Sequence, residues 1–155
     1  MLSTLLPARA DNTYRGHKVA LWLLGLFLLS KVGIGLGSIF NGRVAAGTAD
    51  GIPIDAFTPA GAQAVVSLFA LLGISSLVLC LVGCLVLLRY RALVPLMFSL
   101  LLLEHLSRKL ALFILPIERT SSPGTTVNLV LLAALILGLA LSLWGRSKLH
   151  APSQP

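Results

Sequence analysis

The sequence is poor in charged residues, and in acidic ones above all. Of its 155 residues, 11% are charged, and five are Asp or Glu against twelve Lys or Arg. Soluble domains carry about 25% charged residues, whereas 57% of this chain is hydrophobic. A soluble fold of this length could not bury so much apolar side chain, so we expect lipid to solvate most of the chain.

Aromatic residues and cysteines are scarce as well. Aromatics make up 6% of the chain and do not interleave with a basic patch, which argues against nucleic-acid binding despite the net charge of +7. The two cysteines, Cys80 and Cys84, are four positions apart inside one apolar run. That spacing favours small-residue packing between helices over a disulfide or a redox pair.

The chain also lacks the residue patterns of common catalytic sites. It has no Ser-His-Asp set, no paired carboxylates and no H-E-x-x-H sequence. No second His or acid lies at a spacing that would complete a metal site with His105. We therefore expect a protein that is not an enzyme and that has neither a metal site nor a cofactor.

Long apolar runs are what the chain does have, and their lengths suit membrane crossing. The predicted spans are residues 19–40, 63–88, 92–117 and 127–144. The first is too long for the apolar part of a secretion signal, and Lys31 interrupts it, so we interpret it as a retained span. The fold class predicted is all-α, a polytopic four-helix transmembrane bundle in which residues 19–145 form the membrane domain.

The segments between the runs add detail. Residues 41–61 are rich in Gly, Pro, Asn and Asp, which predicts an irregular loop with at most one short turn of helix. Thr58 followed by Pro59 is typical of a helix start. The loop at residues 89–91 is so short that the second and third spans should be antiparallel neighbours.

Basic residues outside the apolar runs are unevenly distributed between the two sides of the predicted bundle. Seven lie on the side of the chain ends: Arg9, Arg15, Lys18, Arg89, Arg91, Arg146 and Lys148. Only Arg43 and Arg119 lie on the other. The positive-inside rule then places both ends in the cytoplasm, as segments 1–18 and 146–155, and makes the protein a multi-pass protein of the inner cell membrane.

Five ionisable residues fall inside the apolar spans. They are Lys31, Glu104, His105, Arg108 and Lys109. Each charge at the centre of a membrane helix costs about 2.5 to 3.5 kcal/mol on insertion scales, so such residues should face the bundle interior and be paired. Glu104 and Arg108 are four apart with the acid first, which is the favourable orientation on a helix.

A pairing between helices is also allowed. Lys31 lies 13 residues beyond Lys18, and Glu104 lies 13 residues beyond Arg91. At about 1.5 Å per residue, both are roughly 20 Å from the cytoplasmic edge. Equal depth permits a contact between Lys31 and Glu104, although depth says nothing about which way each side chain points.

Three interpretations of these charges stay open. The cluster can be a site for an anionic or amphiphilic ligand, because its positive charges outnumber its one acid. It can instead be a boundary, with the helix ending near Leu110 and with Arg108 and Lys109 reaching the outer interface. It can also line a proton or ion path. His105 is expected to be a hydrogen-bonded interior residue rather than a metal ligand.

The layout resembles the DoxX-like group of small bacterial membrane proteins. The resemblance covers residues 19–145 and lies in the first span, WLLGLFLLSKVGIGLG, and in LVGCLVLLRYRALVPLMFSLLLLE across the second and third. The stretch EHLSRK departs from that group's pattern. The resemblance implies a four-helix bundle and an accessory role in redox or small-molecule handling, and it carries over no functional residue.

The function expected from the sequence is that of a non-enzymatic accessory or ligand-binding membrane protein. Its charged site would hold an anionic small molecule, a lipid or a quinone, and its partners would be the bilayer and a second copy or another membrane protein. The alternative is a small oligomeric transporter that uses the same residues as an anion or proton-coupled path. The few polar residues on the second and fourth spans favour the first hypothesis.

Overall fold

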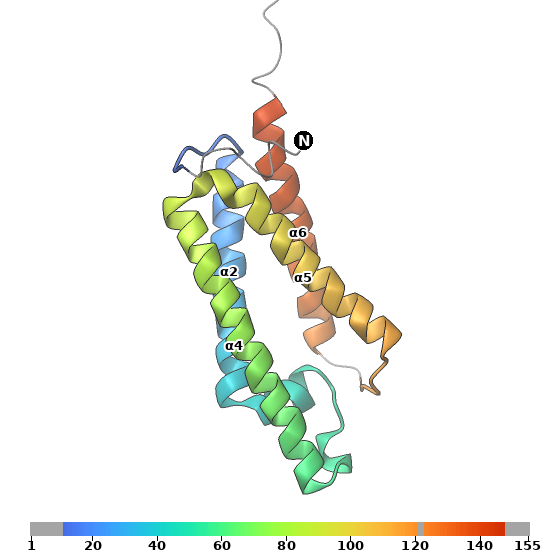
Figure 1. Cartoon of the computed structure of the whole chain (residues 1–155). Helices are drawn as coiled ribbons and strands as arrows, with labels where there is room; N and C mark the ends of the chain where they lie inside the picture. The colour runs from blue at the N-terminus through green and yellow to red at the C-terminus, as the bar shows by residue number, and fades with distance from the viewer. Residues whose placement is uncertain (1–10, 121–122, 148–155) are drawn as a thin grey trace, which may run out of the picture.

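The computed structural model describes residues 11–120 and 123–147, all of whose regular structure is helical. Four long helices make up most of it (Figure 1): α2 (Lys18–Phe40), α4 (Pro59–Arg89), α5 (Val94–Ile114) and α6 (Pro123–Ser147). The short helices are α3 (Gly42–Val44), the π-helical η1 (Ala45–Ala49), and the 3₁₀ helices η2 (Ile54–Ala56) and η3 (Arg91–Leu93). The predicted all-α class is confirmed. The outermost parts of both predicted end segments, residues 1–10 and 148–155, lie outside the described residues.

Among the described residues, three helices are long and apolar enough to cross a membrane. They are α2, α4 and α6. The fourth long helix, α5, contains Glu104, Arg108 and Lys109 within its 21 residues, and it is not one of the three. The charges that mark a candidate site therefore also set α5 apart from its neighbours.

The helix ends follow local chemistry. Thr58 caps α4 as predicted, since its hydroxyl oxygen accepts a hydrogen bond from the Gly61 amide at 3.2 Å. Helix α5 ends at Ile114, three residues before the end of the predicted span, because Pro116 restricts the residue before it and has no amide to donate. Helix α6 begins at Pro123, four residues earlier than predicted, and proline suits the first position of a helix.

Helices α2 and α4 pack most closely. A Cβ atom built on Gly73 of α4 would lie 2.7 Å from the carbonyl oxygen of Gly35 in α2, so only glycine allows the two backbones to approach this far. Further along the pair, Gly83 lies against the side chain of Leu28, and the Cys80 thiol lies 3.9 Å from the Leu28 carbonyl oxygen. Cys80 is thus a packing residue of the α2–α4 interface.

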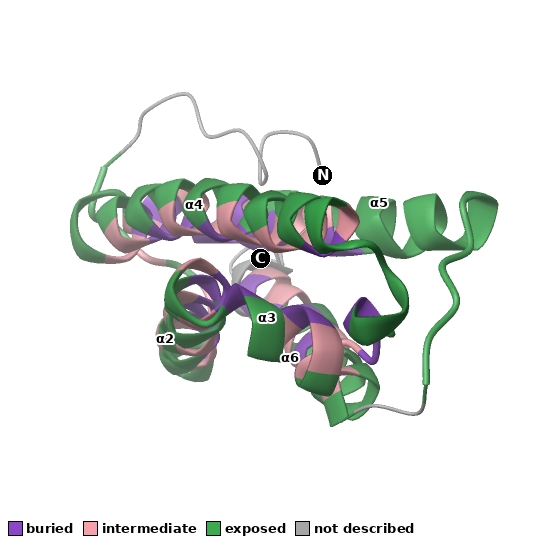
Figure 2. Ribbon diagram, turned by 90° about the horizontal axis from the view of Figure 1, so that it is seen from below, coloured by how far each residue is buried: buried purple, intermediate pink, exposed green. Residues whose placement is uncertain are grey.

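Helix α5 turns away from α4 and packs on α6. The two helices joined by the tight turn run in opposite directions but separate progressively beyond it (Figure 1). The prediction that they are antiparallel neighbours therefore holds only near the turn. In the first half of α5, Phe98 is fully buried and meets Gly138 of α6. Residues 106–114 are exposed on every side, as the green end of α5 in Figure 2 shows.

The segment between α2 and α4 is more ordered than predicted. It contains three short helices, and its Ala46, Ile52 and Ile54 form a small core with Ala62 of α4. The Gly51 carbonyl accepts hydrogen bonds from the amide and the hydroxyl of Thr120, at 2.9 and 3.2 Å. These bonds attach the connection after α5 to the segment between α2 and α4.

Candidate functional site

Lys31 lies on the face of α2 that packs into the protein. The buried residues of this helix recur at helical spacing, and Lys31 continues a stripe that contains Leu24, Leu28 and Gly35. Its side chain is only 5% exposed, and its ammonium nitrogen lies 3.3 Å from Oε2 of Glu104. The contact that equal depth allowed between Lys31 and Glu104 is confirmed.

Glu104 binds two cations, one with each carboxylate oxygen. Oε2 accepts from Lys31, and Oε1 accepts from the guanidinium of Arg108 at 3.4 Å, one turn further along α5. The Glu104 side chain is 29% exposed and that of Arg108 is 53% exposed. The three residues therefore form a line from the buried interior at Lys31 to the surface of α5 at Arg108.

The formal charges in this line do not cancel. One carboxylate faces two cations, which leaves one positive charge in excess. Lys31 is the buried cation and needs Glu104 as its counter-charge, because an unpaired charge in the interior is strongly unfavourable. The excess therefore lies at the exposed end, on Arg108. Lys109 follows it, is exposed, and makes no ion pair within the described part of the chain.

His105 lies on a different face of α5 from these charged residues. It is buried on the stripe of α5 that contains Phe98 and Leu101, the face directed toward α6. Its Nε2 atom has no hydrogen-bond partner among the described residues. The prediction of an interior residue is confirmed, but the predicted hydrogen bond is not found. Of the five predicted residues, the structure thus brings together Lys31, Glu104 and Arg108.

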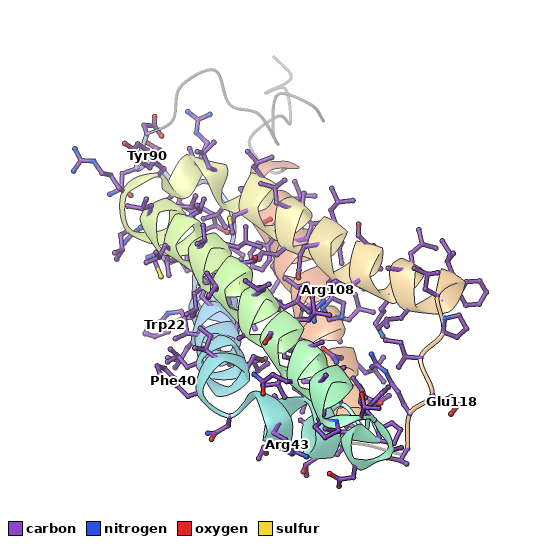
Figure 3. All side chains as sticks on the ribbon, turned by 60° about the horizontal axis from the view of Figure 1, so that its bottom comes forward. Trp22, Phe40, Arg43, Tyr90, Arg108 and Glu118 are labelled. Carbon is purple, nitrogen blue, oxygen red and sulfur yellow. The ribbon has the colours of Figure 1, made fainter. Side chains whose placement is uncertain are left out.

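A groove lies beside this line of charges, where α4 and α5 separate. Its volume is about 390 Å³, and its walls are mostly apolar. Helix α4 contributes Leu72, Ser75, Ser76, Val78, Leu79 and Val82, and α5 contributes Glu104 and Arg108. Figure 3 shows the Arg108 side chain on the side of α5 that faces α4. The exposed end of the line of charges therefore opens into the groove.

The two serines on the α4 wall differ in their hydrogen bonding. The Ser75 hydroxyl donates to the Leu71 carbonyl oxygen of its own helix at 3.1 Å. The Ser76 hydroxyl makes no hydrogen bond within residues 11–120 and 123–147. The two serines are adjacent in the sequence, and apolar residues flank the pair on both sides. Only the divergence of α4 from α5 shows that they line a groove.

A second hollow, of about 500 Å³, lies in the segment between α2 and α4, where Arg43 and Asp55 are among its lining residues. These two side chains pair with each other at 3.2 Å and are both exposed to solvent. This hollow therefore offers no charge in excess, and the groove is the stronger candidate. No group of three or more His, Cys, Asp or Glu residues in the described ranges could hold a metal ion.

Comparison of this chain with protein-family models, curated proteins and solved structures found no match. The DoxX-like resemblance thus stays a prediction from residue patterns.

Proposed function

We propose that this chain is a non-enzymatic membrane protein that binds an anionic, amphiphilic ligand in the groove between α4 and α5. One observation carries the proposal. Glu104 lies between Lys31 and Arg108 and can neutralise only one of them. The remaining positive charge lies on Arg108, at the wall of a mostly apolar groove.

The chemistry of Arg108 suits such a ligand. A guanidinium presents five N–H donors, and Glu104 uses only a long contact of 3.4 Å, so most donors remain for a carboxylate or a phosphate. Charge-assisted hydrogen bonds are strengthened where water is excluded. Ser76 offers a further hydroxyl from the opposite wall. The apolar side chains beside these groups favour a ligand with a hydrocarbon part.

Oleate, a carboxylate with one hydrocarbon chain, provides a direct probe of this function. The protein purified in mild detergent should retain oleate in native mass spectrometry, and Arg108→Gln should weaken binding about tenfold or more, because a hydrogen bond to a charged group contributes about 1.5 to 3 kcal/mol. Arg119→Gln, which removes the same charge from an exposed position outside the groove, is the matched control. Equal oleate retention by all three proteins would refute the site.

The membrane arrangement that goes with this function has four spans. In this arrangement α5 crosses the inner cell membrane with α2, α4 and α6, and both ends of the chain lie in the cytoplasm. Two findings support it. The first half of α5 is buried against the other helices, and the pairing of Glu104 with Lys31 lowers the cost of placing α5 in lipid. The distribution of basic residues favours the orientation.

This orientation predicts a labelling pattern for introduced cysteines. Thr48 and Glu118 are exposed beyond the ends of α2 and α5, and Asn12 is exposed before α2. In a background without Cys80 and Cys84, cysteines at Thr48 and Glu118 should react with an impermeant maleimide added to intact cells. A cysteine at Asn12 should react only after the cells are opened. Labelling of the cysteine at position 12 in intact cells would show that the orientation is the opposite of the one proposed.

A further inference from the structure

The groove has a polar end and an apolar end, which lie at different positions along α4 and α5. Glu104 and Arg108 form the polar end, while Val78, Leu79 and Val82 continue the α4 wall toward the turn that joins α4 to α5. The helices are still close near that turn, since a Cβ atom on Gly83 would lie 3.3 Å from the Met97 side chain. The apolar end therefore narrows toward the turn at η3.

The position of Arg108 relative to the bilayer follows from the same geometry. Lys31, and with it Glu104, lies roughly 20 Å from the membrane edge at Lys18, taking about 1.5 Å per residue. Arg108 is one turn further from that edge, by at most about 6 Å along α5. The hydrocarbon core of a bilayer is about 30 Å thick. Arg108 therefore lies within about one helical turn of the head groups of the leaflet on the Phe40 side.

From this polarity we infer that the occupant of the groove is an anionic phospholipid of the leaflet on the Phe40 side. Its phosphate lies at Arg108, and one acyl chain lies along Val78, Leu79 and Val82. A lipid in that leaflet already has this orientation, with its phosphate outward and its chains toward the bilayer centre. The inference rests on the proposed function and adds to it the class of the ligand and the orientation of that ligand in the groove.

Charge complementarity separates this occupant from a second copy of the chain. Arg108 and Lys109 need a negative group at their own depth. In the sequence the one acid inside the apolar spans is Glu104, which already binds both Lys31 and Arg108. A second copy therefore brings no free carboxylate to this depth. Lipid phosphates lie within about one helical turn of this depth throughout the membrane, and basic pockets between membrane helices are suited to bind them.

The test uses phosphatidylglycerol, phosphatidylcholine and inorganic phosphate, each added to the full-length protein in mild detergent and followed by native mass spectrometry. Val82→Trp fills the apolar end of the groove. Leu81→Trp is its control, because Leu81 is also on α4, is 65% exposed against 45% for Val82, and does not line the groove. Val78→Trp, at a further exposed position of the groove wall, repeats the test should Val82→Trp fail to fold.

We expect phosphatidylglycerol to be retained by the wild type and by Leu81→Trp, and to bind about tenfold more weakly to Arg108→Gln. The Val82→Trp and Val78→Trp proteins should bind phosphatidylglycerol several-fold more weakly than the wild type does. The wild type and Leu81→Trp should bind phosphatidylcholine more weakly than phosphatidylglycerol. Two results would overturn the inference and leave the proposed function standing. They are loss of phosphatidylglycerol in Arg108→Gln with unchanged retention in Val82→Trp and Val78→Trp, and equal binding of the two lipids by the wild type. Retention of inorganic phosphate in place of phosphatidylglycerol would overturn both the inference and the proposed function, because inorganic phosphate has no hydrocarbon part. Absence of any anion bound through Arg108 would overturn both.

Discussion

Glu104→Gln is expected to destabilise the protein by about 3 to 5 kcal/mol, the cost of leaving one partner of a buried ion pair without its counter-charge. The stranded group is Lys31, whose side chain is 5% exposed and has Glu104 as its one ion-pair partner in the described structure. Equilibrium unfolding in mixed micelles of a mild detergent and SDS, followed by circular dichroism, measures the loss. The amount of protein that accumulates in membranes should fall as well.

Glu118→Gln is the matched control for this substitution. It removes the same charge by the same chemical change, but Glu118 is exposed beyond the end of α5 and makes no ion pair in the described structure. We expect its unfolding transition to be close to that of the wild type. Equal and small losses for the two variants would mean that water hydrates Lys31 and that the cluster is a boundary of the membrane.

Lys31→Met should restore most of the stability that Glu104→Gln removes. The double variant replaces the ion pair by an apolar and a neutral side chain, and replacing a buried pair as a whole is often neutral or stabilising. Lys31→Met alone should be milder than Glu104→Gln alone, since Glu104 is 29% exposed and keeps its contact with Arg108. The interaction energy between the two sites should reach the upper part of the range of about 0.5 to 3 kcal/mol.

A complete cycle of wild type, two single variants and the double variant measures this coupling. Each protein is unfolded in the same mixed micelles, so the four free energies are directly comparable. If the two single losses simply add in the double variant, Lys31 and Glu104 are not in contact. Lys31 would then need another partner, such as a carbonyl oxygen of its own helix.

The parts of the fold that could be predicted from the sequence follow from the length, the rise and the ends of individual helices. Long apolar runs predicted α2, α4 and α6, because membrane thickness determines the length of a span. The contact between Lys31 and Glu104 could be anticipated because the rise of a helix is constant, so equal distances from a basic edge mean equal depth. The capping of α4 by Thr58 followed from the chemistry of a hydroxyl next to proline.

The parts that the sequence did not predict depend on the direction in which side chains and helices point. Depth alone could not show that His105 faces α6 while its neighbour Glu104 reaches α2. The tight turn suggested that α4 and α5 lie side by side, but α5 packs on α6 and leaves a groove behind it. The role of Ser76 and Val82 as walls of that groove follows only from this divergence.

Photo-cross-linking in native membranes tests most directly whether a ligand occupies the groove at Arg108. Leu72 lies in the groove wall and Leu81 does not, and both are exposed leucines of α4, so each can be replaced by a diazirine amino acid. After illumination and mass spectrometry, position 72 should carry an anionic amphiphile, and this adduct should disappear when Arg108→Gln is added. Position 81 should give only the mixture of bulk lipids. The same adducts at both positions, or an adduct at position 72 that persists in Arg108→Gln, would contradict the account.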